Sequence, residues 1–430
     1  MSESAPPAQP PPATTDPAPG GAAAAGGGSV PGGSGGGPGR SAAGGGAEGF
    51  GDLLDLASRR LGGSVIAAND ETFAPKESLV LPAAPEFVPG TYGPRGQVYD
   101  GWETRRRREP GQDWAVVRLG VPGIVHGVVV DTAHFTGNFP ESCTVDGRWA
   151  DGYPGPAELL GDGAAGGAGW DALVPRRALR GDTRNAFLVA QPRLVTHVRL
   201  TIHPDGGVAR LRVLGEVVPD PRRLAGGPVD LAAAENGARI EAASDRFYSD
   251  PGNVLLPGRA ATMGEGWETR RRRDAGNDWL RLGLAAAGHV RQVVVDTTHF
   301  VGNAPGAARI LGCDATAADP ADPASWWELL PRTDLQPDTR HWFRTGGDRR
   351  VTHARLDVYP DGGLSRLRLY GDLAPDGAAA LARRWWNALP AAAATALLVA
   401  AGLPADAAQD AAAARPAADV PPALRPSLLG

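Results

Sequence analysis

The segment Asp100-Gly101-Trp102-Glu103-Thr104-Arg105-Arg106-Arg107-Arg108 occurs twice in this chain, the second time as Glu265-Gly266-Trp267-Glu268-Thr269-Arg270-Arg271-Arg272-Arg273. Trp267 follows Trp102 by 165 residues, and the pairs Asp113-Trp114 and Asp278-Trp279 keep the same spacing. So do the segments Asp131-Thr132-Ala133-His134-Phe135-Thr136-Gly137-Asn138 and Asp296-Thr297-Thr298-His299-Phe300-Val301-Gly302-Asn303. A repeat of this length indicates a duplicated structural unit. The sequence therefore predicts two copies of one domain.

The repeat continues downstream with a shorter spacing. Pro204-Asp205-Gly206-Gly207 recurs 156 residues later as Pro360-Asp361-Gly362-Gly363, and a Gly/Ala-rich insertion at 161–169 accounts for the difference. Val128-Val129-Val130 and Val293-Val294-Val295 are β-branched runs that favour buried strands. Residues 197–202 alternate polar and apolar side chains, which is typical of a half-exposed strand. We therefore predict an all-β fold of two tandem jelly-roll β-sandwiches, at residues 47–218 and 238–373.

Three segments lie outside these predicted domains. Residues 1–46 are almost entirely Gly, Ala, Pro and Ser, and such a segment cannot bury enough apolar surface to fold, so we expect it to be disordered. A Pro- and Arg-rich linker is expected at 219–237. Residues 374–430 read as an Ala/Pro-rich tail with one short helix near Trp385 and Trp386, disordered from Pro416 onward.

Composition excludes several classes of protein. The 43 basic and 48 acidic side chains nearly balance, with a net charge of −5, which argues against nucleic acid as the main partner. Two cysteines point to a reducing compartment. The start lacks the features of a secretory signal, and the longest apolar stretch, 391–403, is too short to span a bilayer. We expect a soluble, cytoplasmic protein without a membrane partner.

The arginine-rich segment is the first candidate site. In an extended chain, alternate side chains share a face, so Glu103, Arg105 and Arg107 are expected to lie on one side. Arginine forks bind carboxylates with two parallel hydrogen bonds, and a neighbouring Glu can transfer protons. Two alternatives remain open at this point: a salt-bridged exposed strand, and an RNA-binding basic run.

The second candidate site follows each Val run. Asp131 with His134, or Asp296 with His299, could act as an acid/base pair or as metal ligands. A set made of His134, His197 and a carboxylate would suit Mn²⁺ or Zn²⁺, although hydrogen-bonded structural histidines are the alternative. Cys143 and Cys313 do not align between the copies, so neither is expected to be a nucleophile. The tryptophans of the repeat are expected in the core: Trp102, Trp114, Trp267 and Trp279.

Taken together, these motifs resemble the allantoicase family. The resemblance covers residues 65–372 and is carried by the segments 101–107, 113–114 and 131–140 with their partners 266–272, 278–279 and 296–305. Ser244-Asp245-Arg246-Phe247-Tyr248 and Pro360-Asp361-Gly362-Gly363 add to it. The first copy departs from the pattern, because Asn69-Asp70-Glu71-Thr72-Phe73 stands where the second has Ser-Asp-x-Phe-Tyr. The long Gly/Pro-rich start is also not a feature of the family.

The resemblance implies two galactose-binding-like sandwiches that hydrolyse allantoate to ureidoglycolate and urea. It also implies a homo-oligomer, and a response of some members to a divalent metal such as Mn²⁺. For this chemistry we expect Arg105 and Arg107, or Arg270 and Arg272, to hold the substrate carboxylate, with Asn138 and Asn303 at the ureido groups. Proton transfer is expected from these residues: Glu103, Asp131 and His134, and Glu268, Asp296 and His299. The alternative function is a non-catalytic carbohydrate- or small-anion-binding protein.

Overall fold

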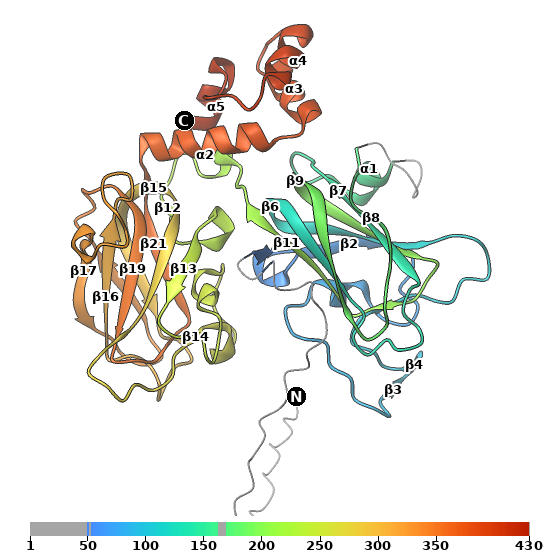
Figure 1. Ribbon diagram of the computed structural model, residues 1–430, viewed down its shortest axis with the longest axis horizontal. Helices are drawn as coiled ribbons and strands as arrows, with labels where there is room; N and C mark the ends of the chain where they lie inside the picture. Colours follow the sequence, from blue (N-terminus) through green and yellow to red (C-terminus); the bar gives the residue numbers. More distant parts are fainter. Residues whose placement is uncertain (1–49, 51–52, 162–168, 430) are drawn as a thin grey trace, which may run out of the picture. The chain divides into compact units, whose positions relative to one another are not determined.

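A computed structural model describes residues 50, 53–161 and 169–429. Figure 1 shows two β-rich bodies followed by a group of helices at the C-terminal end of the chain. The two bodies are tandem β-sandwiches in which every recorded strand pair is antiparallel, so the predicted fold class is confirmed. The segment 1–46, expected to be disordered, and most of the 161–169 insertion lie outside the described residues.

The first sandwich is a seven-stranded sheet with the order β1-β11-β6-β9-β7-β8, and β2 also pairs with β6. Its strands are β1 (Leu54–Asp55), β2 (Ser64–Ala68), β6 (Asp113–Asp131), β7 (Ser142–Arg148), β8 (Asp171–Ala178), β9 (Arg184–His203) and β11 (Arg210–Val217). The predicted strands at 128–130 and 197–202 are parts of β6 and β9.

The second sandwich repeats this plan in an eight-stranded sheet, with the order β12-β21-β15-β19-β16-β17 and with β13 and β18 paired to β15. Its strands are β12 (Val229–Asp230), β13 (Arg239–Ala243), β15 (Asp278–Asp296), β16 (Ala307–Cys313), β17 (Trp327–Asp334), β18 (Arg340–Arg344), β19 (Val351–Tyr359) and β21 (Arg366–Leu373). The second sandwich therefore begins earlier than expected, because β12 lies in the segment 219–237 and pairs with β21.

One long strand connects the two layers of each sandwich. The first half of β6 pairs with β2, its second half pairs with β11, and β9 accompanies both halves. The pairing register shifts between Arg118 and Gly123, and such irregularities bend a sheet. β15 has a similar arrangement, with β13 on its first half and β21 on its second. The role of β9 is divided here: β19 pairs with the first half, with a shift between Gly283 and Gly288, and β18 pairs with the second. Apolar side chains that alternate along these strands therefore face a common interior.

Short ribbons and 3-10 helices complete the two bodies. The ribbons β5 (Trp102–Glu103) with β10 (Gly207–Val208), and β14 (Trp267–Glu268) with β20 (Gly363–Leu364), carry the repeated Trp-Glu motif. A further ribbon joins β3 (Tyr92–Gly93) to β4 (Gly96–Gln97). The 3-10 helices are η1 (Arg59–Leu61), η2 (Lys76–Val80), η3 (Pro221–Arg223), η4 (Ala234–Asn236), η5 (Pro251–Leu255), η6 (Met263–Glu265), η7 (Pro323–Ser325) and η8 (Pro422–Leu424).

Each sandwich has its own apolar core. Trp102 and Trp267 are fully buried in these cores, as predicted. Trp114 and Trp279 are only half-buried, so the core assignment was wrong for them; the Arg355 guanidinium lies over the Trp279 ring, 4.8 Å from its centre. Outward faces of β6 and β15 remain partly open at these positions.

The C-terminal segment is folded, which differs from the expected tail with one short helix. It contains α2 (Pro375–Ala388), α3 (Ala391–Ala400), α4 (Ala405–Ala413) and α5 (Arg425–Leu429). The short helix α1 (Pro156–Leu160) belongs to the first sandwich instead. Trp385 and Trp386 are buried in a third apolar cluster that also contains Leu194 and Val218. Val420, Leu424 and Leu428 are buried as well, so the expectation of disorder from Pro416 onward was wrong. Within the described residues, no helix is long and apolar enough to cross a membrane.

Candidate active site

The repeated Trp-Glu-Thr-Arg motif alternates between the core and the surface. In the second repeat Trp267 and Thr269 are buried, whereas Glu268 is half-buried and Arg270 is exposed. Thr269 is fixed by Gly362, whose amide donates to the Thr269 hydroxyl at 3.0 Å. The first repeat has the same alternation, and the Gly206 amide donates to Thr104 at 3.1 Å. Because adjacent side chains of an extended segment point in opposite directions, the glutamate and the first arginine share the outward face.

An amide side chain holds each outward glutamate. Asn138 donates through Nδ2 to Glu103 Oε1 at 2.7 Å, and Asn303 donates to Glu268 Oε1 at the same distance. Burial raises the pKa of Glu103, and the hydrogen bond from Asn138 opposes this rise only in part. The structure therefore brings together Glu and Asn in both repeats, about 35 residues apart in sequence.

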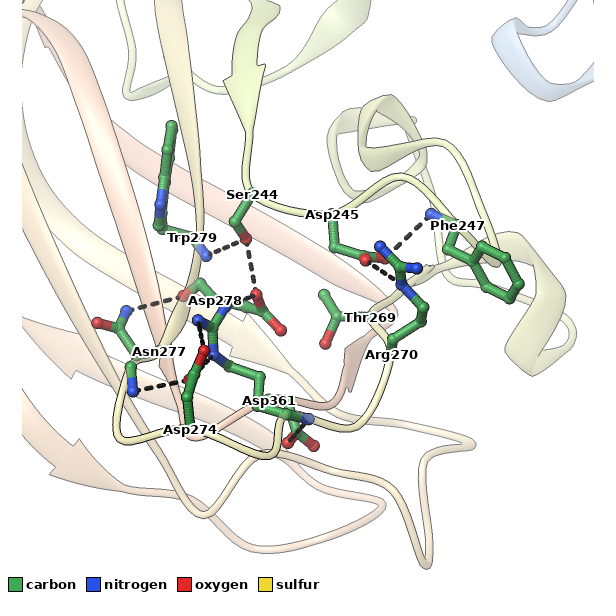
Figure 2. Close-up of polar contacts among 12 residues, drawn as sticks. Ser244, Asp245, Phe247, Thr269, Arg270, Asp274, Asn277, Asp278, Trp279 and Asp361 are labelled. Atoms are coloured by element: carbon green, nitrogen blue, oxygen red, sulfur yellow. Dashed lines mark hydrogen bonds and ion pairs between the residues drawn. The ribbon is translucent and has the colours of Figure 1, made fainter.

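The first arginine of each run is held by a buried aspartate. Arg270 Nε lies 2.9 Å from Asp245 Oδ2, and Arg105 Nε lies 3.0 Å from Asp70 Oδ2. Both aspartate side chains are 7% exposed, whereas the arginine side chains are 63% and 71% exposed. Burial alone would raise the pKa of Asp245, but hydrogen bonds from Phe247 and Arg270 outweigh burial, and the pKa is lowered. Figure 2 shows Arg270 between Asp245 and the Phe247 ring.

The third arginine of each run points elsewhere, so the prediction that it shares the face of the glutamate was wrong. Arg272 Nη1 donates to the buried Asp278 at 2.8 Å, and its Nε donates to Asp274 at 2.9 Å. Arg107 Nη1 likewise donates to Asp113 at 2.6 Å. The strands β5 and β14 end at the glutamate, and the chain then turns, because the Arg107 and Arg272 amides bind Asp205 and Asp361. Arg107 and Arg272 therefore anchor the loop.

The Asp-Thr-x-His segments form turns, and among the described residues no hydrogen bond joins the Asp of a segment to its His. Asp131 Oδ1 accepts the Ala133 amide at 2.9 Å, and the His134 ring Nε2 lies 3.2 Å from the Pro85 carbonyl oxygen. Asp296 and His299 repeat this pattern, with the His299 ring 3.0 Å from the Ala260 carbonyl. Both histidines have a left-handed backbone conformation, with φ of 68° for His134 and 74° for His299. Hydrogen bonds from their backbone amides to the Asp182 and Asp338 carboxylates stabilise this conformation. These turns lead the chain to Asn138 and Asn303.

The expected metal ligands do not assemble. Among the residues that the structure describes, no group of three or more His, Cys, Asp or Glu side chains could hold a metal ion. His197 is buried beside Thr196, whose hydroxyl lies 2.9 Å from Nδ1, and burial with nearby Arg118 and Arg148 lowers the pKa of His197 to about 4. The donor set thus does not fit Mn²⁺ or Zn²⁺, and His197 is a structural residue of β9.

Sequence reasoning did not select the aspartates that organise the site. Asp70 and Asp245 belong to the segments 69–73 and 244–248, which carried the resemblance but were given no role. Asp113 and Asp278 recur at the same spacing as the arginines, so this regularity could have identified them as ion-pair partners. Ser249 was also missed; its hydroxyl accepts the Glu268 amide at 2.8 Å.

Comparisons with known proteins agree with the duplication of the chain. The allantoicase repeat model matches residues 54–218 and 229–374. A "Probable allantoicase" of Nocardia farcinica is 56% identical over 327 residues, covering 76% of this chain and 96% of that protein. Another, of Streptomyces avermitilis, is 49% identical over 347 residues, covering 78% and 90%. The crystal structure of allantoicase from Saccharomyces cerevisiae superposes with a TM-score of 0.63 at 33% identity, covering 74% of this chain and 93% of that one. This chain therefore belongs to the allantoicase family.

Proposed function

We propose that this chain hydrolyses allantoate to ureidoglycolate and urea in purine degradation. The observation that carries the proposal is that Glu268 and Arg270 share the outward face of the motif, with Asn303 hydrogen-bonded to Glu268. Glu103, Arg105 and Asn138 repeat this arrangement in the first repeat. A carboxylate ligand fits Arg270, because its side chain is exposed and, among the described residues, the recorded hydrogen bond of its guanidinium is made by Nε. The matches to allantoicases over most of their length support this substrate.

The proposed chemistry adds water across one carbon–nitrogen bond. The water oxygen bonds to the central carbon of allantoate as the carbon–nitrogen bond breaks, and one proton passes from the water side to the leaving nitrogen, giving urea. We propose that Glu268 or Glu103 transfers this proton. Burial raises the pKa of Glu103, and a carboxyl group with a raised pKa is better suited to exchange protons near neutral pH. Asn303 and Asn138 would orient that carboxyl group.

The remaining predicted residues take supporting roles in this proposal. Asp131 with His134, and Asp296 with His299, shape the turns that present the asparagines. Arg107 and Arg272 hold the loop after the motif through buried aspartates. We also propose a homo-oligomer and a cytoplasmic location; both cysteines are free and buried, as suits a reducing compartment.

The proposal is tested by mixing purified full-length protein with allantoate and measuring urea over time, with EDTA in one arm and added Mn²⁺ in another. We expect urea release in every arm, because the described residues contain no metal-binding cluster. Folded protein that releases no urea in any arm would contradict the proposed reaction. Loss of activity with EDTA and its return with Mn²⁺ would support the proposed reaction but contradict the expectation that it needs no metal.

A further inference from the structure

The two repeats present equivalent arginines, Arg105 and Arg270, in different surroundings. Each is two residues after the site glutamate and is bound through Nε to a buried aspartate. A substrate carboxylate needs a guanidinium whose direction is fixed and whose terminal nitrogens are free. The surroundings of the two arginines therefore decide which repeat can recognise the carboxylate.

Asp245 fixes Arg270 from one side. Its Oδ2 binds Arg270 Nε at 2.9 Å, and its Oδ1 accepts the Phe247 amide at 3.0 Å, so these two donors bind different carboxylate oxygens. Within the part of the chain that the structure describes, neither Nη1 nor Nη2 of Arg270 has a recorded hydrogen bond. Both nitrogens can therefore serve an incoming carboxylate.

The Phe247 ring makes a cation–π contact with the same guanidinium. The Arg270 guanidinium carbon lies 4.9 Å from the centre of the Phe247 ring, within the range of a cation–π contact. The ring is itself held edge-on by Tyr248, with 4.9 Å between the ring centres. Phe247 and Tyr248 are 63% and 61% exposed, so these aromatic side chains lie at the surface where a ligand can approach.

The first repeat lacks this support. Thr72 stands at the position of Phe247, and its hydroxyl donates to Asp70 Oδ2 at 3.1 Å. Arg105 Nε binds that same oxygen at 3.0 Å, so the two donors compete for it. Arg105 has no recorded aromatic ring beneath it among the described residues. Its guanidinium is therefore held less firmly than that of Arg270.

We propose that Asp245 and Phe247 are positioning residues for Arg270, and that they make the second repeat the one that recognises the substrate carboxylate. This inference rests on the proposed function, because the carboxylate in question belongs to allantoate. It assigns the non-equivalence of the repeats to residues 245 and 247.

The test compares KM and kcat for allantoate in four variants of the full-length chain. We expect Asp245→Asn to raise KM roughly tenfold, which corresponds to about 1.4 kcal/mol, because the charge-assisted hydrogen bond that fixes Arg270 is weakened. Phe247→Thr, which installs the residue of the first repeat, should raise KM roughly two- to fivefold. In both variants kcat should stay within about twofold, as expected when only binding is lost. Asp70→Asn should raise KM less than Asp245→Asn does.

Asp274→Asn is the matched control, since Asp274 also binds an arginine through Nε but belongs to the loop anchor; its KM should be unchanged. Equal KM effects in Asp70→Asn and Asp245→Asn, or a fall in kcat with KM unchanged, would overturn the inference. If Asp245→Asn does not fold, Phe247→Thr still decides, because it keeps the ion pair. Wild-type protein without urea release would refute the proposed function, whereas normal wild-type turnover with KM unchanged in Phe247→Thr would refute this inference alone.

Discussion

At the scale of single residues, the partner of each arginine decides its role. Arg272 is engaged at both Nε and Nη1 by two aspartates, one of them buried, so its fork is occupied. Within the described part of the chain, the Arg270 guanidinium has a recorded hydrogen bond at Nε and none at Nη1 or Nη2, and its side chain stays largely exposed. Arg270 and Arg272 therefore have different surroundings, although their side chains are chemically identical.

The site glutamates are expected to be essential for turnover. Glu268→Gln and Glu103→Gln keep the size of the side chain and its contact with asparagine but remove proton transfer. We expect kcat to fall by roughly 10²–10⁴ in the double variant, the usual contribution of general acid–base catalysis. Urea release by the two single variants and the double variant is the measurement. Unchanged turnover in all three would rule out a catalytic role for these carboxyl groups.

Asp245 is expected to make stability depend on pH. Its pKa is lowered from the ordinary value of 3.8, so the charged carboxylate of Asp245 is more stable in the folded state than in the unfolded state. This contribution is present above pH 3.8 and is lost as pH falls through the lower folded pKa. Asp245→Asn should therefore reduce the free energy of unfolding by about 1 kcal/mol at pH 7, a modest value because Arg270 is exposed. Denaturant unfolding of both proteins should give converging values in strong acid; a constant difference would contradict the assignment.

At the scale of elements, the two-residue ribbon β14–β20 positions the site. Gly363 pairs with Glu268, and a Cβ on Gly363 would lie 1.9 Å from the Phe300 ring. The ring of Phe300 and the ribbon therefore pack at a distance that only glycine allows. Gly207 and Phe135 make the equivalent contact in the first repeat.

Gly363→Ala is expected to disturb both folding and activity. Overpacking of this kind costs about 1–3 kcal/mol, and here it would displace the strand that carries Glu268. Gly302→Ala is the matched control, since a Cβ there meets nothing within 4 Å. Thermal unfolding and urea release should both be impaired in the first variant and nearly normal in the second. Equal behaviour of the two variants would show that the ribbon tolerates displacement.

At the scale of the whole molecule, the C-terminal helices are part of the folded protein. The apolar cluster of these helices includes Leu194 of β9 and Val218, which follows β11. Arg384 of α2 lies 2.9 Å from Glu216, and Arg350 lies close to both Asp314 and Asp376. These contacts tie residues 375–429 to residues of both repeats, although the family model ends at residue 374.

Trp386→Ala is expected to destabilise the protein by about 3–5 kcal/mol, because the side chain is fully buried and its removal leaves a cavity. Val399→Ala in α3 is the control, since Val399 is 45% exposed and its truncation should change stability by less than about 0.5 kcal/mol. Chemical unfolding monitored by circular dichroism compares the two. A similar, small effect for both would mean that α2 contributes little to the stability of the molecule.

The sequence by itself determined the duplication, the fold class and the identity of the motif residues, because these follow from repeated spacing and from alternation along strands. It also placed Glu103 beside Arg105 on one face. Only the tertiary structure decided which partners these groups meet, since Asp245 and Arg270 lie 25 residues apart and Glu268 and Asn303 lie 35 apart. The turn at Asp361, the left-handed backbone of His299 and the burial of Trp386 likewise depend on distant packing. Local sequence patterns predict which face of a strand a side chain occupies, whereas contacts between distant segments determine its hydrogen-bond partners and its exposure.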